Sequence, residues 1–165
     1  MKKLLCAAGV SIALAMSAGA YAEKIAIVNV GEVFQSIPAR EAVAKQLENE
    51  FKSRATELQN LEKALQSDIG KLQRDGATMS ASDRQKQEKE LITKRDQFAE
   101  KAQKFEEDNR RRQAEERNKI LSRIQDSIKS VAAQEGYDVV IDANAVAYAK
   151  DGIDITSQVK KQVNK

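Results

Sequence analysis

A basic segment in the second half of the chain has the residue types and spacing for binding an anion. It occupies residues 98–112, reads FAEKAQKFEEDNRRR and ends in three consecutive arginines. At about 100° per residue on a helix, Lys101, Arg111 and Arg112 fall on one face, whereas Arg110 points to the opposite side. Cationic side chains gathered on one face can hold an anionic group. Lys101, Arg111 and Arg112, here called the basic trio, are therefore a candidate anion site.

The same segment also has a purely structural interpretation. Asp108 and Glu115 fall in the same sector of the helix as the basic trio and would partly neutralise it. Opposite charges three or four residues apart stabilise an exposed helix by only a few tenths of a kcal/mol per pair. A solvated helix with many salt bridges is therefore the open alternative to an anion site on physical grounds.

Residue types that usually carry catalysis are scarce in this sequence. The chain has no histidine, and its single cysteine, Cys6, lies near the N-terminus. The aspartates at residues 138–154 do not have the spacing of a calcium loop, and Gly152 among them is more simply a turn residue. The sequence also has no glycine-rich loop for phosphate binding. We therefore expect neither an enzyme nor a metal site, and no cofactor.

The first 22 residues have the pattern of a secretory signal. A basic start, KK, precedes an apolar stretch at residues 4–16, and AYA at residues 20–22 gives a small-residue cleavage site. The apolar stretch is too short to span a membrane core of about 30 Å comfortably. We expect cleavage after Ala22 and an exported, soluble mature chain that begins at Glu23 and has no cysteine.

The charge balance argues against a nucleic-acid partner. Two of the 28 basic residues lie in the expected signal, which leaves 26 against 25 acidic residues and a net charge of +1. Affinity for nucleic-acid phosphates needs clustered and unbalanced lysine and arginine. A secreted nucleic-acid binder is therefore not expected.

A first long helix is predicted at residues 39–74, which contain almost no helix breakers. Pro38 suits its first position, where a missing N–H costs nothing. Apolar residues exactly one heptad apart form a narrow seam along one face of a helix, and four of them do so here. These four residues are Phe51, Leu58, Leu65 and Leu72.

A stop signal followed by a start signal predicts a turn after this helix. The interruption reads RDGATMSAS, and we expect Gly76 to end the helix in a left-handed conformation. Ser82 and Gln85 have the spacing of a capping box for the next helix. The two helices should then run antiparallel as a hairpin.

The second helix is predicted at residues 83–134, with Gly136 as its C-terminal cap. Leu91, Phe98 and Phe105 continue a seven-residue seam that faces the partner helix. At about 1.5 Å per residue, some 50 residues make a rod of about 75 Å, much longer than a small domain is wide. The hairpin must therefore project from the rest of the molecule.

A small head is predicted from both ends of the mature chain. Residues 24–30, 137–142 and 145–149 read as strands of a three-stranded sheet, and Thr156 is expected to cap a last helix that ends at Val163. Such a head has only about 50 residues, which is small for a stable core without a disulfide or a metal. Oligomerisation, with strands of several subunits meeting, is the natural remedy.

These elements predict an α+β fold in three parts. Residues 1–22 are the signal, residues 23–37 together with 136–165 form the head, and residues 38–135 form the hairpin with its tip near residues 75–82.

Several segments together resemble the Skp/OmpH family of periplasmic chaperones. They are KIAIVNVGEVFQ, LENEFKSRATELQ, FAEKAQKFEEDNRRR, EERNKI and DANAVAYA, which are spread over nearly the whole chain. The resemblance implies a homotrimer in which a β-barrel-like head forms on assembly and one hairpin, or tentacle, projects from each subunit. It also implies an ATP-independent holdase that binds unfolded outer-membrane β-barrel proteins in the cavity between the tentacles and aids their delivery.

The resemblance gives the basic segment a specific expected ligand. Members of the family have a proposed lipopolysaccharide-binding motif whose basic positions match Lys101, Arg111 and Arg112 of this sequence. Lipopolysaccharide or an anionic membrane surface is thus the expected second partner, beside unfolded outer-membrane proteins. The seven-residue seams leave one alternative, which is a structural coiled-coil protein of the envelope without client binding.

Overall fold

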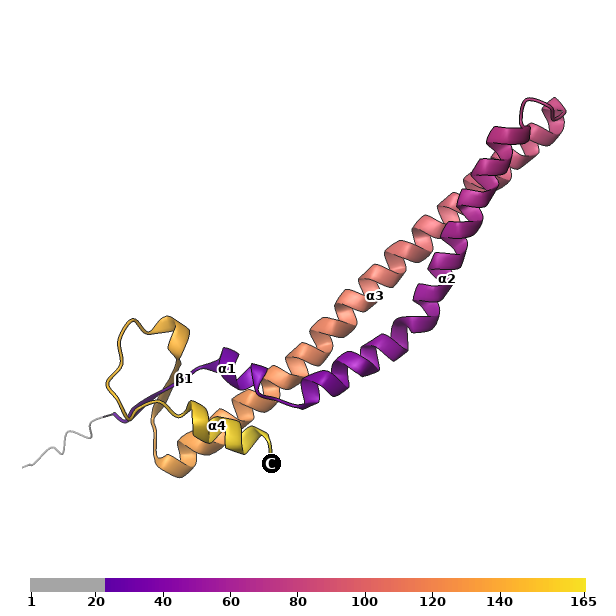
Figure 1. Cartoon of the computed structure of the whole chain (residues 1–165). Helices are drawn as coiled ribbons and strands as arrows, with labels where there is room; N and C mark the ends of the chain where they lie inside the picture. Colours follow the sequence, from indigo (N-terminus) through magenta and orange to yellow (C-terminus); the bar gives the residue numbers. More distant parts are fainter. Residues whose placement is uncertain (1–22) are drawn as a thin grey trace, which may run out of the picture.

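The computed structural model describes residues 23–165, so the expected signal and its cleavage site lie outside the described residues. A small head built from both ends of this part of the chain carries one long helical hairpin (Figure 1). The elements are, in order, β1 (Ile25–Val28), α1 (Val30–Gln35), α2 (Ala39–Asp75), α3 (Ala81–Glu135), β2 (Val139–Asp142), the 3-10 helix η1 (Ala143–Ala145) and α4 (Thr156–Val163).

The sheet of the head has two parallel strands, with Ile25 of β1 beside Val139 of β2. The predicted strand at residues 145–149 is wrong. The Asp142 side chain accepts a hydrogen bond of 2.9 Å from the Asn144 amide and so turns the chain into η1. The chain returns to β1 only at a single bridge between Ile27 and Asp154. The sheet therefore has one strand fewer than the sequence suggested.

A compact apolar core joins β1, α1, α3 and α4 in the head. Ile124 of α3 is completely buried against β1, α1 and α4, which all contribute small or β-branched side chains. The buried core residues are Ala26, Val28, Val33, Ile37, Ile124, Val131, Ile155, Val159 and Val163. Because Ile124 and Val131 near the end of α3 belong to this core, the hairpin is anchored in the head through its longer helix.

The start of α4 differs from the expected cap. Its N-cap residue is Ile155, and the Asp154 carboxylate accepts a hydrogen bond of 2.8 Å from the Thr156 amide. The Thr156 hydroxyl accepts one of 2.9 Å from the Asn29 amide. Thr156 is one residue too far along to cap the helix, so its predicted role is wrong. It connects the end of β1 to α4 instead.

The tip of the hairpin corrects two further predictions. Gly76 is the C-cap of α2, as predicted, but it is right-handed, with φ of −59° and ψ of −27°, and its amide donates to the Leu72 carbonyl at 3.0 Å. The N-cap of α3 is Ser80, which accepts from the Asp83 amide at 3.1 Å, whereas Ser82 already lies inside the first turn. A serine with an extended backbone stands two residues earlier than expected and starts the helix there.

The base of the hairpin agrees with the sequence. Pro38 has φ of −62° and is the N-cap of α2, one residue before the predicted first position. Gly136 ends α3 with φ of +70°, which confirms its left-handed conformation. A glycine is favoured there because a Cβ atom is strained at positive φ.

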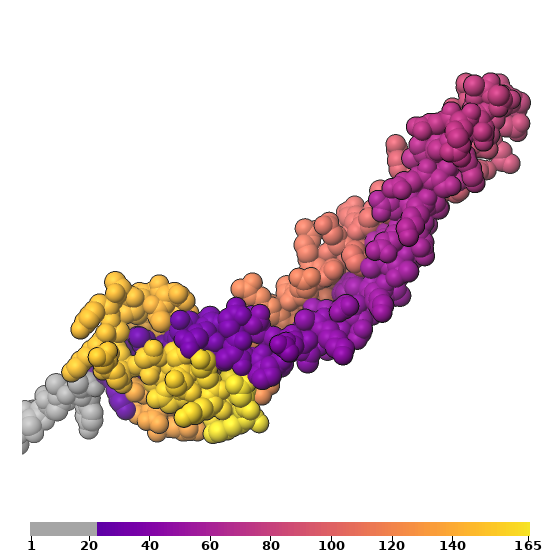
Figure 2. All heavy atoms as spheres, viewed as in Figure 1, coloured from indigo at the N-terminus to yellow at the C-terminus, as the bar shows by residue number. Residues whose placement is uncertain are grey.

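The two predicted seams lie between α2 and α3. Phe51 is buried, and the other six seam residues are half-buried. The rings of Phe51 and Phe105 meet edge to face with centroids 5.6 Å apart. Two helices side by side bury only one narrow stripe each, so nearly all of the projecting arm is surface (Figure 2).

Candidate functional site

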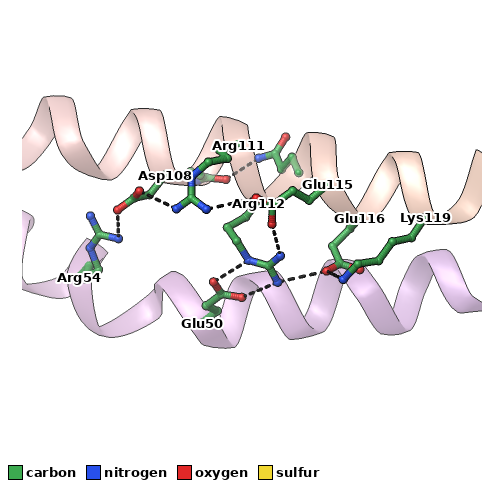
Figure 3. Close-up of polar contacts among 10 residues, drawn as sticks. Glu50, Arg54, Asp108, Arg111, Arg112, Glu115, Glu116 and Lys119 are labelled. Carbon is green, nitrogen blue, oxygen red and sulfur yellow. Dashed lines mark hydrogen bonds and ion pairs between the residues drawn. The ribbon is translucent and has the colours of Figure 1, made fainter.

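The basic trio lies on the middle of α3, opposite the part of α2 that contains Glu50, Arg54 and Glu57 (Figure 3 shows the section around the arginines). The sequence positions the trio simply, because α3 runs without interruption through residues 98–112. The side chains do not stand free in solvent. Each member of the trio is paired with at least one carboxylate.

Arg112 is the most enclosed member of the trio. Its guanidinium binds Glu50 of α2 through two hydrogen bonds of 2.9 and 3.2 Å, and it also contacts Glu115 at 2.7 Å and Glu116 at 3.1 Å. Its side chain is only 18% exposed. The hydrogen bond to Glu50, followed by that to Glu115, raises the pKa of Arg112 further above its usual value. Arg112 thus connects α3 to α2.

Arg111 remains on the outer side of the same helix. It contacts Asp108 at 2.9 Å and Glu115 at 3.2 Å, and its side chain is 59% exposed. Asp108 also binds Arg54 of α2 at 3.0 Å. The hydrogen bond from Arg111, and then that from Arg54, lowers the pKa of the Asp108 carboxyl. The prediction that Asp108 and Glu115 partly neutralise this sector is confirmed.

Lys101 lies apart from the two arginines. Its ammonium pairs with Glu57 of α2, and about half of its side chain is exposed. Arg111 and Arg112 share Glu115, so the structure brings these two together and leaves Lys101 in a separate ion pair. Arg110 is exposed and pairs with no carboxylate of residues 23–165, in agreement with its predicted place on the opposite face.

One residue of this region was not found from the sequence. The Arg54 guanidinium lies 5.6 Å from the ring centre of Phe51 and 5.7 Å from that of Phe105, and it also pairs with Asp108. The sequence contained part of the information needed to find Arg54, because each seam includes one of the two phenylalanines that its guanidinium approaches. The missing information was the register of α2 against α3, which decides which charged residues face each other.

Residues 23–165 contain no group of three or more histidine, cysteine, aspartate or glutamate side chains placed to hold a metal. None of the helices in this range is both long and apolar enough to cross a membrane.

Comparison with known proteins places this architecture in a family. The family described as Outer membrane protein (OmpH-like) matches residues 24–163, which is almost the whole described chain. The chain belongs to the OmpH family. The resemblance noted from the sequence segments is thereby confirmed.

Relatives within the OmpH family are similar over their full length. The chain is 69% identical to Chaperone protein Skp of Photorhabdus luminescens and 52% identical to Chaperone protein Skp of Escherichia coli K12, each over 99% of both chains. A solved OmpH-like outer membrane chaperone of Caulobacter crescentus is 19% identical, with a TM-score of 0.69 over 88% of this chain and 86% of the other. That structure therefore shows the same fold.

Proposed function

We propose that this OmpH-family chain is an ATP-independent periplasmic holdase that binds unfolded outer-membrane β-barrel proteins, keeps them from aggregating and aids their delivery for assembly. The names of its relatives, which are chaperones, support this proposal. The observation that carries it is the hairpin itself. A projecting arm with a half-buried apolar seam offers weak contacts to a client without folding around it.

The head is proposed to assemble three copies of the chain into a barrel-like body. Its sheet has only two strands, and three of their large apolar side chains are substantially exposed: Ile25 at 41%, Val139 at 42% and Ile141 at 36%. An exposed apolar sheet with free edges favours pairing with another chain. In this proposal residues 23–37 and 136–165 make the trimer, and residues 38–135 of each copy enclose the client.

Three arms acting on one client explain why no nucleotide is needed. Each contact is weak, but a second and third arm bind the same client at a high effective concentration. Apolar client strands held in this way do not pair with each other, which is the route to aggregation. Because each contact is weak, the client can be released to a binding partner or a membrane in which its folded form is more stable.

The test uses the mature chain, residues 23–165, and a urea-unfolded porin diluted into buffer without nucleotide. We expect light scattering from porin aggregates to fall in the presence of the chaperone, and a mass of three chains in solution by size exclusion with light scattering. Porin that aggregates at the same rate with and without the protein would refute the holdase. An elongated dimer without protection would instead support a structural coiled-coil protein of the envelope.

We also propose that the basic trio contacts lipopolysaccharide or another anionic membrane surface. Lys101 and Arg111 have at least half of their side chains exposed, so a lipid phosphate can reach them if it replaces their carboxylate partners. Replacing Lys101, Arg111 and Arg112 together by Gln should weaken binding to lipopolysaccharide without changing the mass of the assembly. Unchanged lipid affinity would leave these residues as structural ion pairs.

A further inference from the structure

Two aspartates of this chain are followed by glycine, and the structure places them in different surroundings. They are Asp75 at the tip of the hairpin and Asp151 in the loop between η1 and α4. An aspartate followed by glycine is chemically labile, because the glycine amide nitrogen can attack the side-chain carboxyl carbon and has no side chain to hinder the approach. The reaction needs a free amide and a carboxyl group that no other residue holds.

Asp151 and Gly152 meet both requirements. They are exposed and form a turn in which Gly152 has φ of +91°. Neither the Asp151 carboxylate nor the Gly152 amide makes a hydrogen bond or an ion pair among residues 23–165. Apart from the adjacent residues, a Cβ atom at Gly152 would meet no atom within 4 Å, so a ring and a water molecule have room there. Figure 1 shows this part of the chain as an open loop at the side of the head.

Asp75 lacks the free amide. It is the last residue of α2, and the amide of Gly76 donates to the Leu72 carbonyl at 3.0 Å. A Cβ atom at Gly76 would lie 2.4 Å from the same carbonyl oxygen, which shows how closely the helix encloses this position. Attack on the Asp75 carboxyl carbon would first have to break a helical hydrogen bond.

The other aspartates of residues 136–165 are held by backbone amides. Each accepts one hydrogen bond, of 2.8 or 2.9 Å, and each precedes a residue with a side chain. The pairs are Asp138 with the Lys24 amide, Asp142 with the Asn144 amide and Asp154 with the Thr156 amide. Asp151 is therefore the one aspartate of this range whose carboxylate is free within the described chain.

We propose that Asp151 is a site of spontaneous covalent modification, at which aspartate converts to isoaspartate through a cyclic imide. The Gly152 nitrogen forms a bond to the side-chain carboxyl carbon of Asp151, and the carboxyl hydroxyl leaves with the amide proton as one water. Water then opens the ring at either of its two carbonyl carbons. Opening at the main-chain carbonyl leaves the chain connected through the side chain, as isoaspartate, and opening at the other restores aspartate. No oxidant, metal or enzyme is needed.

Isoaspartate at this position lengthens the main chain by one carbon atom, two residues before the chain meets β1. The Ile27 amide donates to the Ile153 carbonyl, and the Ile155 amide donates to the Ile27 carbonyl, both at 2.9 Å. Ile155 is 1% exposed and belongs to the core of the head. The added atom shifts Ile153 relative to β1 or opens the turn. The converted chain therefore holds β1 less firmly.

The experiment follows the mature protein, residues 23–165, in its native assembly during several days of warm incubation. Chromatography of chymotryptic peptides with mass spectrometry separates isoaspartate from aspartate, which have the same mass but differ in retention and fragmentation. We expect isoaspartate to accumulate about ten times faster at Asp151 than at Asp75, because an amide hydrogen bond lowers the reactive population by about that factor. Equal rates at the two sites would overturn the inference.

Asp151→Glu and Asp75→Glu are a matched pair of variants. Each keeps the charge but would need a larger ring, which closes far more slowly. Asp151→Glu should remove most of the isoaspartate, and Asp75→Glu should leave its amount unchanged. In water labelled with heavy oxygen, the new isoaspartate should carry the label, because ring opening consumes a water. Unlabelled isoaspartate, or an equal yield from Asp151→Glu, would refute the cyclic-imide route.

Thermal unfolding followed by circular dichroism tests the consequence for the head. We expect the midpoint of the aged wild-type protein to fall by about 2–4 °C, the shift that loss of roughly one hydrogen bond gives in a chain of this size. The midpoint of aged Asp151→Glu should stay unchanged. An aged protein rich in isoaspartate with an unchanged midpoint would overturn the link between Asp151 and β1. None of these results depends on client binding, so the proposed holdase stands or falls separately.

Discussion

The head and the hairpin are held together by different physical effects. In the head, nine small or β-branched side chains from β1, α1, α3, α4 and two connecting residues are buried to 4% exposure or less. In the hairpin, the 37 residues of α2 contribute one buried side chain, Phe51. Beside the narrow seams, α2 and α3 are joined by four ion pairs, between Glu50 and Arg112, Arg54 and Asp108, Glu57 and Lys101, and Asp68 and Lys94.

This difference explains how a small protein can combine a stable head with a hairpin that unfolds locally more easily. Burial of apolar surface contributes about 25 cal/mol per Å², whereas an exposed ion pair contributes about 1 kcal/mol or less. The head should therefore open only on global unfolding. The hairpin, with few buried contacts, belongs to the low end of local stability, where client-binding elements are usually found.

The largest effect is expected from the core of the head. Ile124→Ala removes a completely buried side chain that connects α3 to β1, α1 and α4. Such substitutions cost about 2–5 kcal/mol, and we expect roughly 3 kcal/mol of unfolding free energy to be lost. Urea unfolding followed by circular dichroism measures it. A loss below about 1 kcal/mol would contradict the view that the head carries the stability.

A smaller and more local effect is expected from the hairpin. Phe51→Ala removes the contact with Phe105, but the site is open at its sides and can collapse or fill with water. We expect roughly 2 kcal/mol, below the usual range of about 3–5 kcal/mol for a buried phenylalanine. Hydrogen exchange should quicken in α2 and the facing part of α3 and stay unchanged in β1 and β2. Equal acceleration in the strands would mean that the two regions unfold together.

Acid should loosen the hairpin before the head. The pKa values of Asp108, Glu115 and Glu116 are lowered, chiefly by hydrogen bonds from Arg111, Arg112 and Lys119 respectively. Because the folded pKa values lie below the unfolded values of about 4, their stabilisation is fully present above pH of about 4 and is lost as the pH falls through the folded values.

Hydrogen exchange at pH 3 and pH 6, corrected for the intrinsic rate, tests this order. Protection around residues 105–120 should decrease at pH 3, by less than Phe51→Ala decreases it. Protection at Ile124 and Val131 should stay unchanged. A core that loosens first in acid would contradict the assignment of these carboxylates to the hairpin.

The smallest effect is expected from a single ion pair across the hairpin. Arg112→Gln leaves Glu50 without its partner, while Glu115 keeps Arg111 and Glu116 keeps Lys119. We expect a slight fall in the thermal midpoint, less than that of Phe51→Ala, and less again at high salt because surface ion pairs are screened. Arg110→Gln is the matched control, since Arg110 is exposed on the other face. Equal midpoints for the two variants would mean that the pair contributes nothing measurable.

The sequence predicted the long elements well because their signals are local. The 39–74 helix, the left-handed Gly136 and the inward seams needed only heptad spacing and capping chemistry. The errors at Ser82 and Thr156 arose where a neighbouring residue competed for the same role. Ser80 capped α3 before Ser82, and Asp154 bound the amide at the start of α4.

The candidate site likewise has features that the sequence predicted and features that it did not. Helical spacing was sufficient to predict that Asp108 and Glu115 would lie beside Arg111 and Arg112. It gave no means of knowing that Glu50 of α2 would pair with Arg112, or that Glu57 would pair with Lys101. Such pairings depend on the register of two helices that are joined through a distant tip.

The sequence by itself determined the long hairpin and its narrow seams, since periodicity is a property of the chain alone, and its characteristic segments already resembled the OmpH family. Only the tertiary structure decided that the sheet has two parallel strands, that Ile124 anchors the arm in the head, and which basic residues are neutralised. These features depend on residues far apart in the sequence, and no local pattern records which of them meet.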